Sequence, residues 1–169
     1  PRPITGTPEA PPLEAIRSYR SITGMPDTGE HSASRKSDGT VAFTIVDDTP
    51  VFGVNSAAPG YTVRDEAMAR DMRARLIERF PEVMANGNIG QRPNDALFHA
   101  ETNALLRAAE SNGGSLSGRT IEMRVDRRLC PSCETVLPYV GLQVGNPTVR
   151  LVDGTGAVWI FRDGAWIKR

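Results

Sequence analysis

The sequence predicts an α/β domain in which helices are layered against one mixed β-sheet. The chain has 169 residues, 39% of them hydrophobic, which suffices for one domain with a buried core. Strand-like and helix-like segments are interspersed from Val41 onward, as expected when crossover helices connect strands. The first 39 residues are instead rich in Pro, Gly, Ser and Thr. We therefore expect residues 40–169 to form the domain and residues 1–39 to form a linker or an adapting N-terminal segment.

The N-terminal segment contains one short helical stretch, LEAIRSYRSI, at residues 13–22. It also contains His31, which is flanked by polar residues. In such a polar segment we expect this histidine to be a solvated loop residue rather than a metal ligand.

A β-hairpin is predicted at the start of the domain. Residues 41–48 (VAFTIVDD) and 49–56 (TPVFGVNS) are rich in β-branched and aromatic residues. The polar residues and the proline at positions 47–50 place the turn between them.

Two helices are expected next. Apolar residues recur at helical spacing over residues 63–80, and the arginines on the opposite face are expected to be solvated. Residues 81–93 contain two glycines and are predicted to form a long loop. Asn94 or Asp95 then provides an N-cap for a helix over residues 96–110.

The second half of the chain supplies the remaining strands. Residues 120–128 alternate as a strand, and residues 131–140 form a helix with Pro131 at its first position, where a missing N–H is harmless. Residues 147–153 form another strand, and residues 157–169 form one strand or a second hairpin.

Composition excludes several functional classes. The formal net charge is zero, which argues against a generally basic nucleic-acid binder but not against local basic patches. No apolar run approaches the length of a membrane span, and no signal peptide is visible. Two cysteines at CxxC spacing do not constitute a disulfide framework.

The chemistry is concentrated in two short stretches, HAETNALLRAAE and LCPSCETVLPYV. They hold His99, Glu101, Cys130 and Cys133 at two predicted helix starts. CxxC alone fits a redox pair, half of a zinc site or chance, and HxE alone is weaker still. Together, one imidazole and two thiols supply three zinc ligands and leave a fourth position open, which favours a catalytic over a structural site.

Glu101 lies two positions from the predicted ligand His99, within reach of a metal-bound water. Zinc lowers the pKa of bound water to about 7, and a neighbouring carboxylate can transfer the proton to a leaving group. These groups suit hydrolytic attack on a carbon that bears an amino group, with ammonia leaving. Without the cysteines, a carboxylate stabilised by the helix dipole would be the preferred interpretation.

At these residues the sequence resembles the zinc-dependent cytidine deaminase superfamily, whose signature is H-x-E followed by P-C-x-x-C. The resemblance covers Val41 to the C-terminus. It implies a three-layer fold with a central five-stranded mixed sheet and helices on both faces. It also implies that His99, Cys130 and Cys133 bind Zn²⁺ and that Glu101 shuttles protons. One departure is Leu129, which stands where the family has proline.

The same resemblance suggests substrate contacts. Family members often end the second strand with an asparagine that binds the sugar or base, which here is Asn55. Aromatic candidates for stacking on a base are Phe52, Tyr61, Phe98 and Trp159. Arginine candidates for phosphate contacts are Arg92, Arg124, Arg127, Arg128 and Arg162.

The layout, a Pro-rich leader before a small C-terminal domain, resembles the toxin domains of bacterial secretion- or contact-delivered systems. The leading expectation is therefore deamination of cytosine to uracil in nucleic acid, above all single-stranded DNA, inside the cytoplasm of a target cell. A cognate immunity protein and a monomeric state are also expected. The alternatives are a deaminase of free cytidine or its nucleotides, an RNA deaminase, and a non-catalytic zinc or CxxC redox domain.

Overall fold

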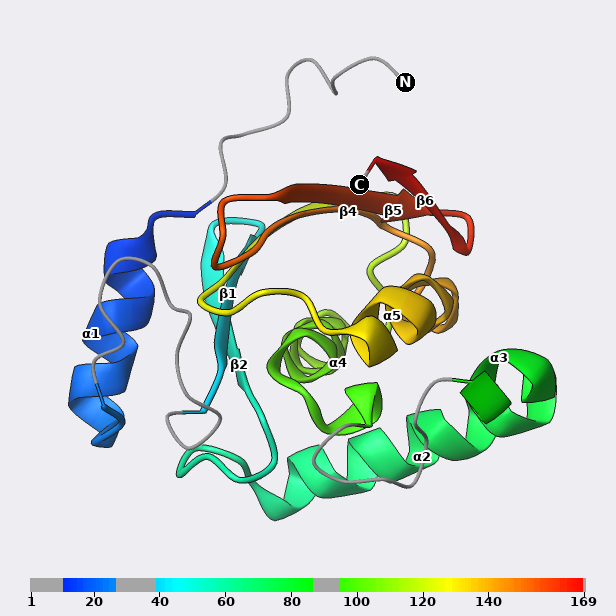
Figure 1. Ribbon diagram of the computed structural model, residues 1–169, viewed down its shortest axis with the longest axis horizontal. Helices are drawn as coiled ribbons and strands as arrows, with labels where there is room; N and C mark the ends of the chain where they lie inside the picture. The colour runs from blue at the N-terminus through cyan, green and yellow to red at the C-terminus, as the bar shows by residue number, and fades with distance from the viewer. Residues whose placement is uncertain (1–10, 27–38, 87–94, 169) are drawn as a thin grey trace.

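Six strands form one mixed sheet in the computed structural model, which describes residues 11–26, 39–86 and 95–168 (Figure 1). Their order is β2-β1-β3-β4-β5-β6. The strands are β1 (Val41–Val46), β2 (Thr49–Val54), β3 (Thr120–Val125), β4 (Thr148–Val152), β5 (Val158–Arg162) and β6 (Ala165–Lys168). The α/β class is thus confirmed, but the expected number of five strands is wrong, because the C-terminal segment forms a hairpin of two strands.

The hairpin of β1 and β2 is tighter than the sequence predicts. Asp47 and Asp48 have φ values of 49° and 65°, as a two-residue type I′ turn requires. Thr49 and Pro50 therefore belong to β2 and not to the turn. Pro50 is tolerated because β2 is an edge strand, where a missing N–H breaks no ladder.

The centre of the sheet is β3, which pairs antiparallel with β1 and parallel with β4. The parallel pair is joined by α5 (Pro131–Gln143), since parallel neighbours need a crossover connection. Pro138 lies inside α5 and cannot donate to the carbonyl of Glu134. The indole N–H of Trp166 on β6 donates to that carbonyl instead, at 2.7 Å, and so fastens the last strand to α5.

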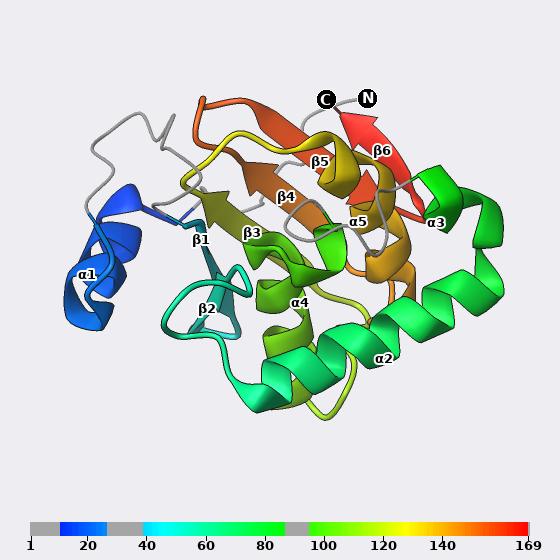
Figure 2. The same cartoon turned by 60° about the horizontal axis from the view of Figure 1, so that its bottom comes forward.

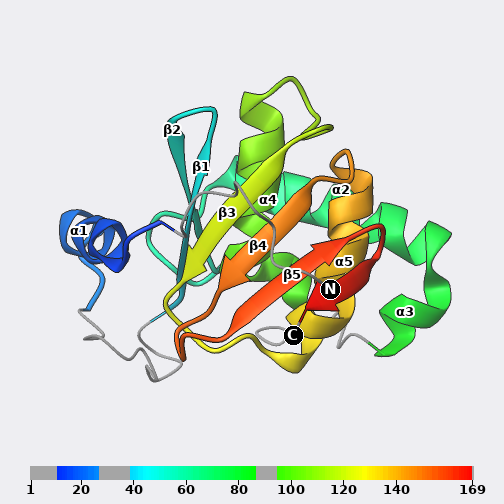
Figure 3. The ribbon, with the colours of Figure 1, turned by 90° about the horizontal axis from the view of Figure 1, so that it is seen from above.

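Helices cover both faces of the sheet, as expected. On one face lie α4 (Ala100–Ser111) and α5, with α2 (Val63–Arg79) running across them (Figures 1 and 2). On the other face α1 (Leu13–Thr23) packs beside β1 (Figure 3). No helix within the described ranges is long and apolar enough to cross a membrane.

A further helix, α3 (Pro81–Asn86), lies where a long loop was expected. Pro81 takes the first helical position, and Met84 is buried in the main core. Residues 87–94, with the two glycines that suggested a loop, lie outside the described part of the chain.

Two apolar cores result. The larger lies between the sheet and the α4–α5 layer and includes Leu105, Met123 and Val136, each with no exposed surface. The smaller lies between α1 and the opposite face of the β1–β2 hairpin and includes Ile16 and Phe43.

A buried ion pair fastens α1 to the end of β3. Arg20 and Asp126 are each 1% exposed, and the Arg20 Nε donates to the Asp126 Oδ2 at 2.6 Å. Arg20 also donates to the carbonyls of Pro26 and Gly39, and Asp126 accepts the backbone N–H of Val41. Burial of these charges is tolerated because both groups are hydrogen-bonded. The helix predicted at residues 13–22 is thus packed on the sheet, while the domain boundary at residue 40 stays a prediction.

The strand β2 and the helix α4 touch backbone to backbone at Gly53. A Cβ atom at this position would lie 2.3 Å from the Ala100 carbonyl oxygen and 2.4 Å from the Ala104 nitrogen. Only glycine permits this approach. It fixes the height of the first turn of α4 above the sheet.

We expect Gly53→Ala to lower the free energy of unfolding by about 3 kcal/mol or more, because helix or strand must move to admit the methyl group. Chemical denaturation of the purified protein measures this. Gly24→Ala is a control, since nothing lies within 4 Å of its Cβ position and only its φ of 79° opposes substitution. That control should cost about 1 kcal/mol. Equal costs for the two variants would contradict the close backbone contact.

Candidate active site

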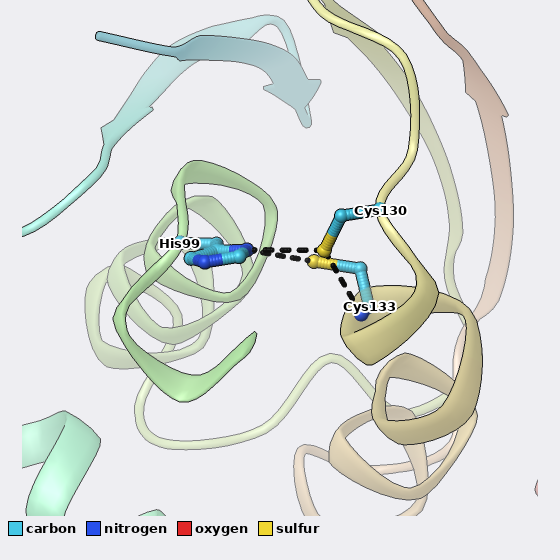
Figure 4. A group of neighbouring side chains, drawn as sticks. All are labelled: His99, Cys130 and Cys133. Carbon is cyan, nitrogen blue, oxygen red and sulfur yellow. Dashed lines mark hydrogen bonds between the residues drawn. The ribbon is translucent and has the colours of Figure 1, made fainter. Parts of the chain in front are cut away.

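Three ligand-type side chains converge from two helix N-termini (Figure 4). The Nδ1 atom of His99 lies 3.3 Å from the Sγ atoms of both Cys130 and Cys133. All three ligand atoms lie within 4.8 Å of one another. The structure therefore brings together the residues of the two sequence stretches.

The cysteines stand at the start of α5. Cys130 is the N-cap residue, and its Sγ accepts the backbone N–H of Cys133 at 3.3 Å. Pro131 at the first helical position has no N–H to satisfy, as expected. A CxxC segment spanning a helix N-terminus places both sulfurs at the positive end of the dipole, which stabilises thiolates.

The sequence predicted one continuous helix over residues 96–110. In the structure this helix is interrupted, and His99 lies just before the start of α4. Residues Ala96–Phe98 form a separate 3₁₀ turn, η2, whose second N–H is capped by the Asp95 side chain at 2.9 Å. The Phe98 carbonyl accepts the N–H of Ser56 at 2.9 Å, in the loop after β2, instead of continuing the helix. His99 becomes the N-cap of α4 and thereby faces α5.

Ser132, between the two cysteines, joins the two segments. Its buried Oγ accepts the backbone N–H of Ala96 at 3.0 Å. The turn that carries His99 and the helix start that carries the cysteines are thus held in register by a hydrogen bond outside the ligand set.

The donor set fits a metal ion. Tetrahedral bonds of about 2.3 Å to sulfur and about 2.0–2.1 Å to nitrogen place ligand atoms roughly 3.5–3.8 Å apart. The observed separations of 3.3 Å between nitrogen and sulfur need only a small expansion. Three ligands leave a tetrahedral ion with one position for a water or a substrate.

The carboxyl group of Glu101 is buried in the first turn of α4 and is 4% exposed. Burial raises its pKa to about 7, against the opposing effect of the nearby His99 imidazole. A buried carboxyl that titrates near neutrality can both accept and donate a proton at pH 7.

The two thiols titrate in opposite directions in the metal-free site. A hydrogen bond from Cys133 lowers the pKa of Cys130 to about 4, which outweighs the effect of burial. The same hydrogen bond, together with burial, raises the pKa of Cys133 well above its ordinary value. The metal-free pair therefore holds one thiolate and one thiol at pH 7.

Residues of the turn between β4 and β5 hold the loop before Cys130 in place through hydrogen bonds. The buried carboxylate of Asp153 accepts the Leu129 N–H at 3.3 Å and the Trp159 indole N–H at 3.0 Å through the same oxygen. The N–H of Gly154 donates to the Arg127 carbonyl at 2.9 Å. Burial opposes ionisation of Asp153, but hydrogen bonds from Thr155 and the indole lower its pKa.

The hydrogen bond from the Leu129 N–H to Asp153 explains why a residue other than proline stands at position 129. A proline at position 129 would have no N–H to donate to Asp153. The side chain of Leu129 is also buried in the main core, at 5% exposure. The departure from the deaminase signature therefore coincides with a backbone hydrogen bond that proline could not make.

The suggested substrate contacts fall in different environments. Asn55 directly follows β2, and its Oδ1 accepts the Thr40 N–H at 2.8 Å. Phe98 is buried in the main core. Phe52 and Tyr61 pack against the smaller core beneath α1, on the face of the sheet away from the cysteines. None of these contacts with substrate is tested by the geometry, and they stay predictions.

Two further residues suggested as substrate contacts, Trp159 and Arg162, differ in their burial. Trp159 packs against the main core and donates to Asp153. Arg162 is exposed on β5 and pairs with Asp163. His31 and Arg92 lie outside the described residues.

Sequence reasoning did not identify Ser132 or Asp153 as parts of the site. Ser132 lies inside the CxxC segment, yet nothing local indicates that its hydroxyl faces residue 96. Asp153 precedes the GTG turn, which does suggest a turn-forming carboxylate. Its bond to Leu129 spans 24 residues and has no local signal.

Comparison with known proteins agrees with the site. A model of the MafB19-like deaminase family matches residues 17–150 of the chain. The matched range includes most of α1, both ligand-bearing segments, the strands β1 to β3 and the beginning of β4. No curated protein matches the chain.

Metal uptake at pH 7 is expected to release about one proton from Cys133 per ion, because the ligand must be a thiolate and the metal-free site holds a thiol. Calorimetric titration with Zn²⁺ in buffers of different ionisation enthalpy measures this. Cys133→Ser should abolish tight binding. Binding without proton release would contradict the assigned protonation of the pair.

Asp153→Asn is expected to weaken metal binding about tenfold, the lower end of what outer contacts of a metal site usually contribute. The amide has one acceptor oxygen, whereas the carboxylate uses two. Competition with a chromophoric chelator measures the affinity. The control is Asp163→Asn. The side chain of Asp163 is exposed and accepts a hydrogen bond from Asn146, and it makes no hydrogen bond to the described residues of the loop before Cys130. Equal affinities in both variants would exclude a positioning effect of Asp153.

Proposed function

The chain belongs to the MafB19-like deaminase family, and from this premise we propose that it deaminates cytosine to uracil in single-stranded DNA, using zinc. The observation that carries the proposal is the His99, Cys130 and Cys133 cluster with the buried Glu101 beside it. Three soft and borderline ligands, an open fourth position and one buried carboxyl are what a hydrolytic deaminase needs.

Zinc is the ion that we propose, because two thiolates and one imidazole at tetrahedral spacing suit it. When bound, zinc acts as a Lewis acid and lowers the pKa of a coordinated water to about 7. His99, Cys130 and Cys133 would hold the ion. The positive ends of α4 and α5 favour the anionic form of the cysteine ligands.

Glu101 is the proposed proton carrier. Water adds to C4 of the base, and the carboxylate of Glu101 takes up the proton that the water loses. The carboxylic acid then returns a proton to the departing amino nitrogen, so that cytosine and water yield uracil and ammonia. A pKa of about 7 in a buried site suits both halves of this transfer.

Between the two forms of DNA, a single strand is the substrate that we favour, because its bases are accessible. A cytosine inside a duplex must be flipped out at a cost of a few kcal/mol, which a single strand avoids. Free cytidine or its nucleotides, and RNA, are the alternative substrates, and zero net charge is compatible with each. A redox role for the CxxC pair would leave Glu101 without a function.

Delivery as a bacterial toxin remains part of the proposal. It is supported by the membership of the chain in a cytidine deaminase-like toxin family. A delivered enzyme of this kind would act in the cytoplasm of the target cell, and its producer would need an immunity protein. Co-purification of a neighbouring gene product would support this part of the proposal.

Glu101→Ala is expected to abolish deamination, with a loss of at least about 100-fold, while zinc remains bound. Single-stranded and duplex oligonucleotides, RNA and free cytidine are incubated with zinc-loaded protein, and C-to-U conversion and ammonia are measured. Glu134→Ala, the same change on the first turn of the other ligand-bearing helix, is the matched control.

Two results would overturn this assignment. Absence of conversion on every substrate with zinc present would exclude a cytosine deaminase. Loss of zinc from Glu101→Ala would make Glu101 a ligand or a structural residue instead of a proton carrier.

A further inference from the structure

Most arginines of the described chain are neutralised by carboxylates. Ion pairs to Asp or Glu are made by Arg20, Arg64, Arg70, Arg73, Arg75, Arg107, Arg119, Arg150 and Arg162. The positive charge of each of these arginines is therefore compensated by a neighbouring carboxylate.

Three arginines that lack such a partner among the described residues occur together, at positions 124, 127 and 128. Arg124 is on β3, and the other two lie in the loop that leads to the metal-ligand candidate Cys130. Arg128 is exposed and Arg127 is half-buried. Uncompensated positive charge is thus concentrated directly before the cysteine pair.

The two carboxylates that are hydrogen-bonded to this loop, Asp126 and Asp153, do not compensate this charge. Asp126 is buried and paired with Arg20. Asp153 is buried, and its oxygens are occupied by N–H and hydroxyl donors. Both carboxylates are buried and hydrogen-bonded within the protein, so neither forms an ion pair with Arg127 or Arg128.

The loop backbone is fixed on both sides of the two arginines. Asp126 is anchored to α1 and to the Val41 N–H, the Arg127 carbonyl accepts from Gly154, and the Leu129 N–H donates to Asp153. The guanidinium groups therefore extend from a rigid base, which reduces the entropy lost when they bind a ligand. Guanidinium forks match phosphate oxygens in geometry and charge.

We infer that Arg127 and Arg128 bind the phosphodiester backbone of single-stranded DNA beside the target cytosine and thereby select a polymer over a free nucleoside. The inference rests on the proposed function, since it assigns the substrate class of the same site. A nucleoside has no phosphate for these residues, whereas a strand carries one on each side of an internal nucleotide. The net charge of zero means that such attraction must come from a local group of this kind.

The test measures binding of a fluorescent oligonucleotide with one cytosine to zinc-loaded protein carrying Glu101→Ala, which prevents turnover. Each of Arg127→Ala and Arg128→Ala should weaken binding about tenfold. Each should also reduce the slope of log affinity against log salt by about 0.7, the value for one phosphate on a single strand. The double Arg→Lys variant should keep the salt slope, because it keeps both charges.

Arg79→Ala is the matched control. Arg79 is exposed in the last turn of α2 and, like Arg127 and Arg128, lacks an ion pair among the described residues. It belongs to a different element from the loop that precedes Cys130. It should bind DNA with unchanged affinity and slope. Zinc content and thermal unfolding of every variant show whether it is folded.

Several results would overturn the inference. One is an unchanged salt slope in the folded double alanine variant, and another is an equal loss in Arg79→Ala. Tighter binding of RNA or duplex DNA than of single-stranded DNA would overturn the assigned polymer. Failure of the wild-type protein to deaminate any substrate, with the slopes changing as expected, would refute the proposed function and leave the phosphate contact standing.

Discussion

The meeting of two helix N-termini is the constraint on which the rest of the site depends. The ligand set is divided between the start of α4 and the start of α5, so a shift of either helix would separate His99 from the cysteines. Gly53 sets the distance of α4 from the sheet, and Ser132 ties the turn before α4 to α5. The site is therefore assembled by packing between elements rather than by one continuous loop.

This arrangement also sets the electrostatics. Helix N-termini are electropositive, so they favour thiolates, and they partly offset the cost of placing a carboxyl among them. Glu101 is nevertheless buried deeply enough that its pKa is raised to about 7. The same apolar packing that positions the ligands thus prepares Glu101 for proton transfer. Stability and chemistry cannot be assigned to separate parts of the molecule here.

The sequence indicated the chemistry better than the geometry. His99, Glu101, Cys130 and Cys133 were identifiable because rare residue types occur at a spacing that metal chemistry requires. The break before His99 was not, because it depends on the Phe98 carbonyl bonding to a residue 42 positions earlier. The short helix α3 was hidden by neighbouring glycines, and long-range hydrogen bonds such as that from Leu129 leave no periodic signal.

Leu129 shows how one substitution can change what a loop is able to do. A proline before the first cysteine would stiffen the loop through its own ring but would remove the N–H. Leucine instead gives up that local stiffness and gains a hydrogen bond to Asp153, whose other oxygen organises the β4–β5 turn. Rigidity is then supplied by the sheet. Among the described residues, Arg127 and Arg128 make no ion pair that would hold this segment, and its position is set by the backbone hydrogen bonds instead.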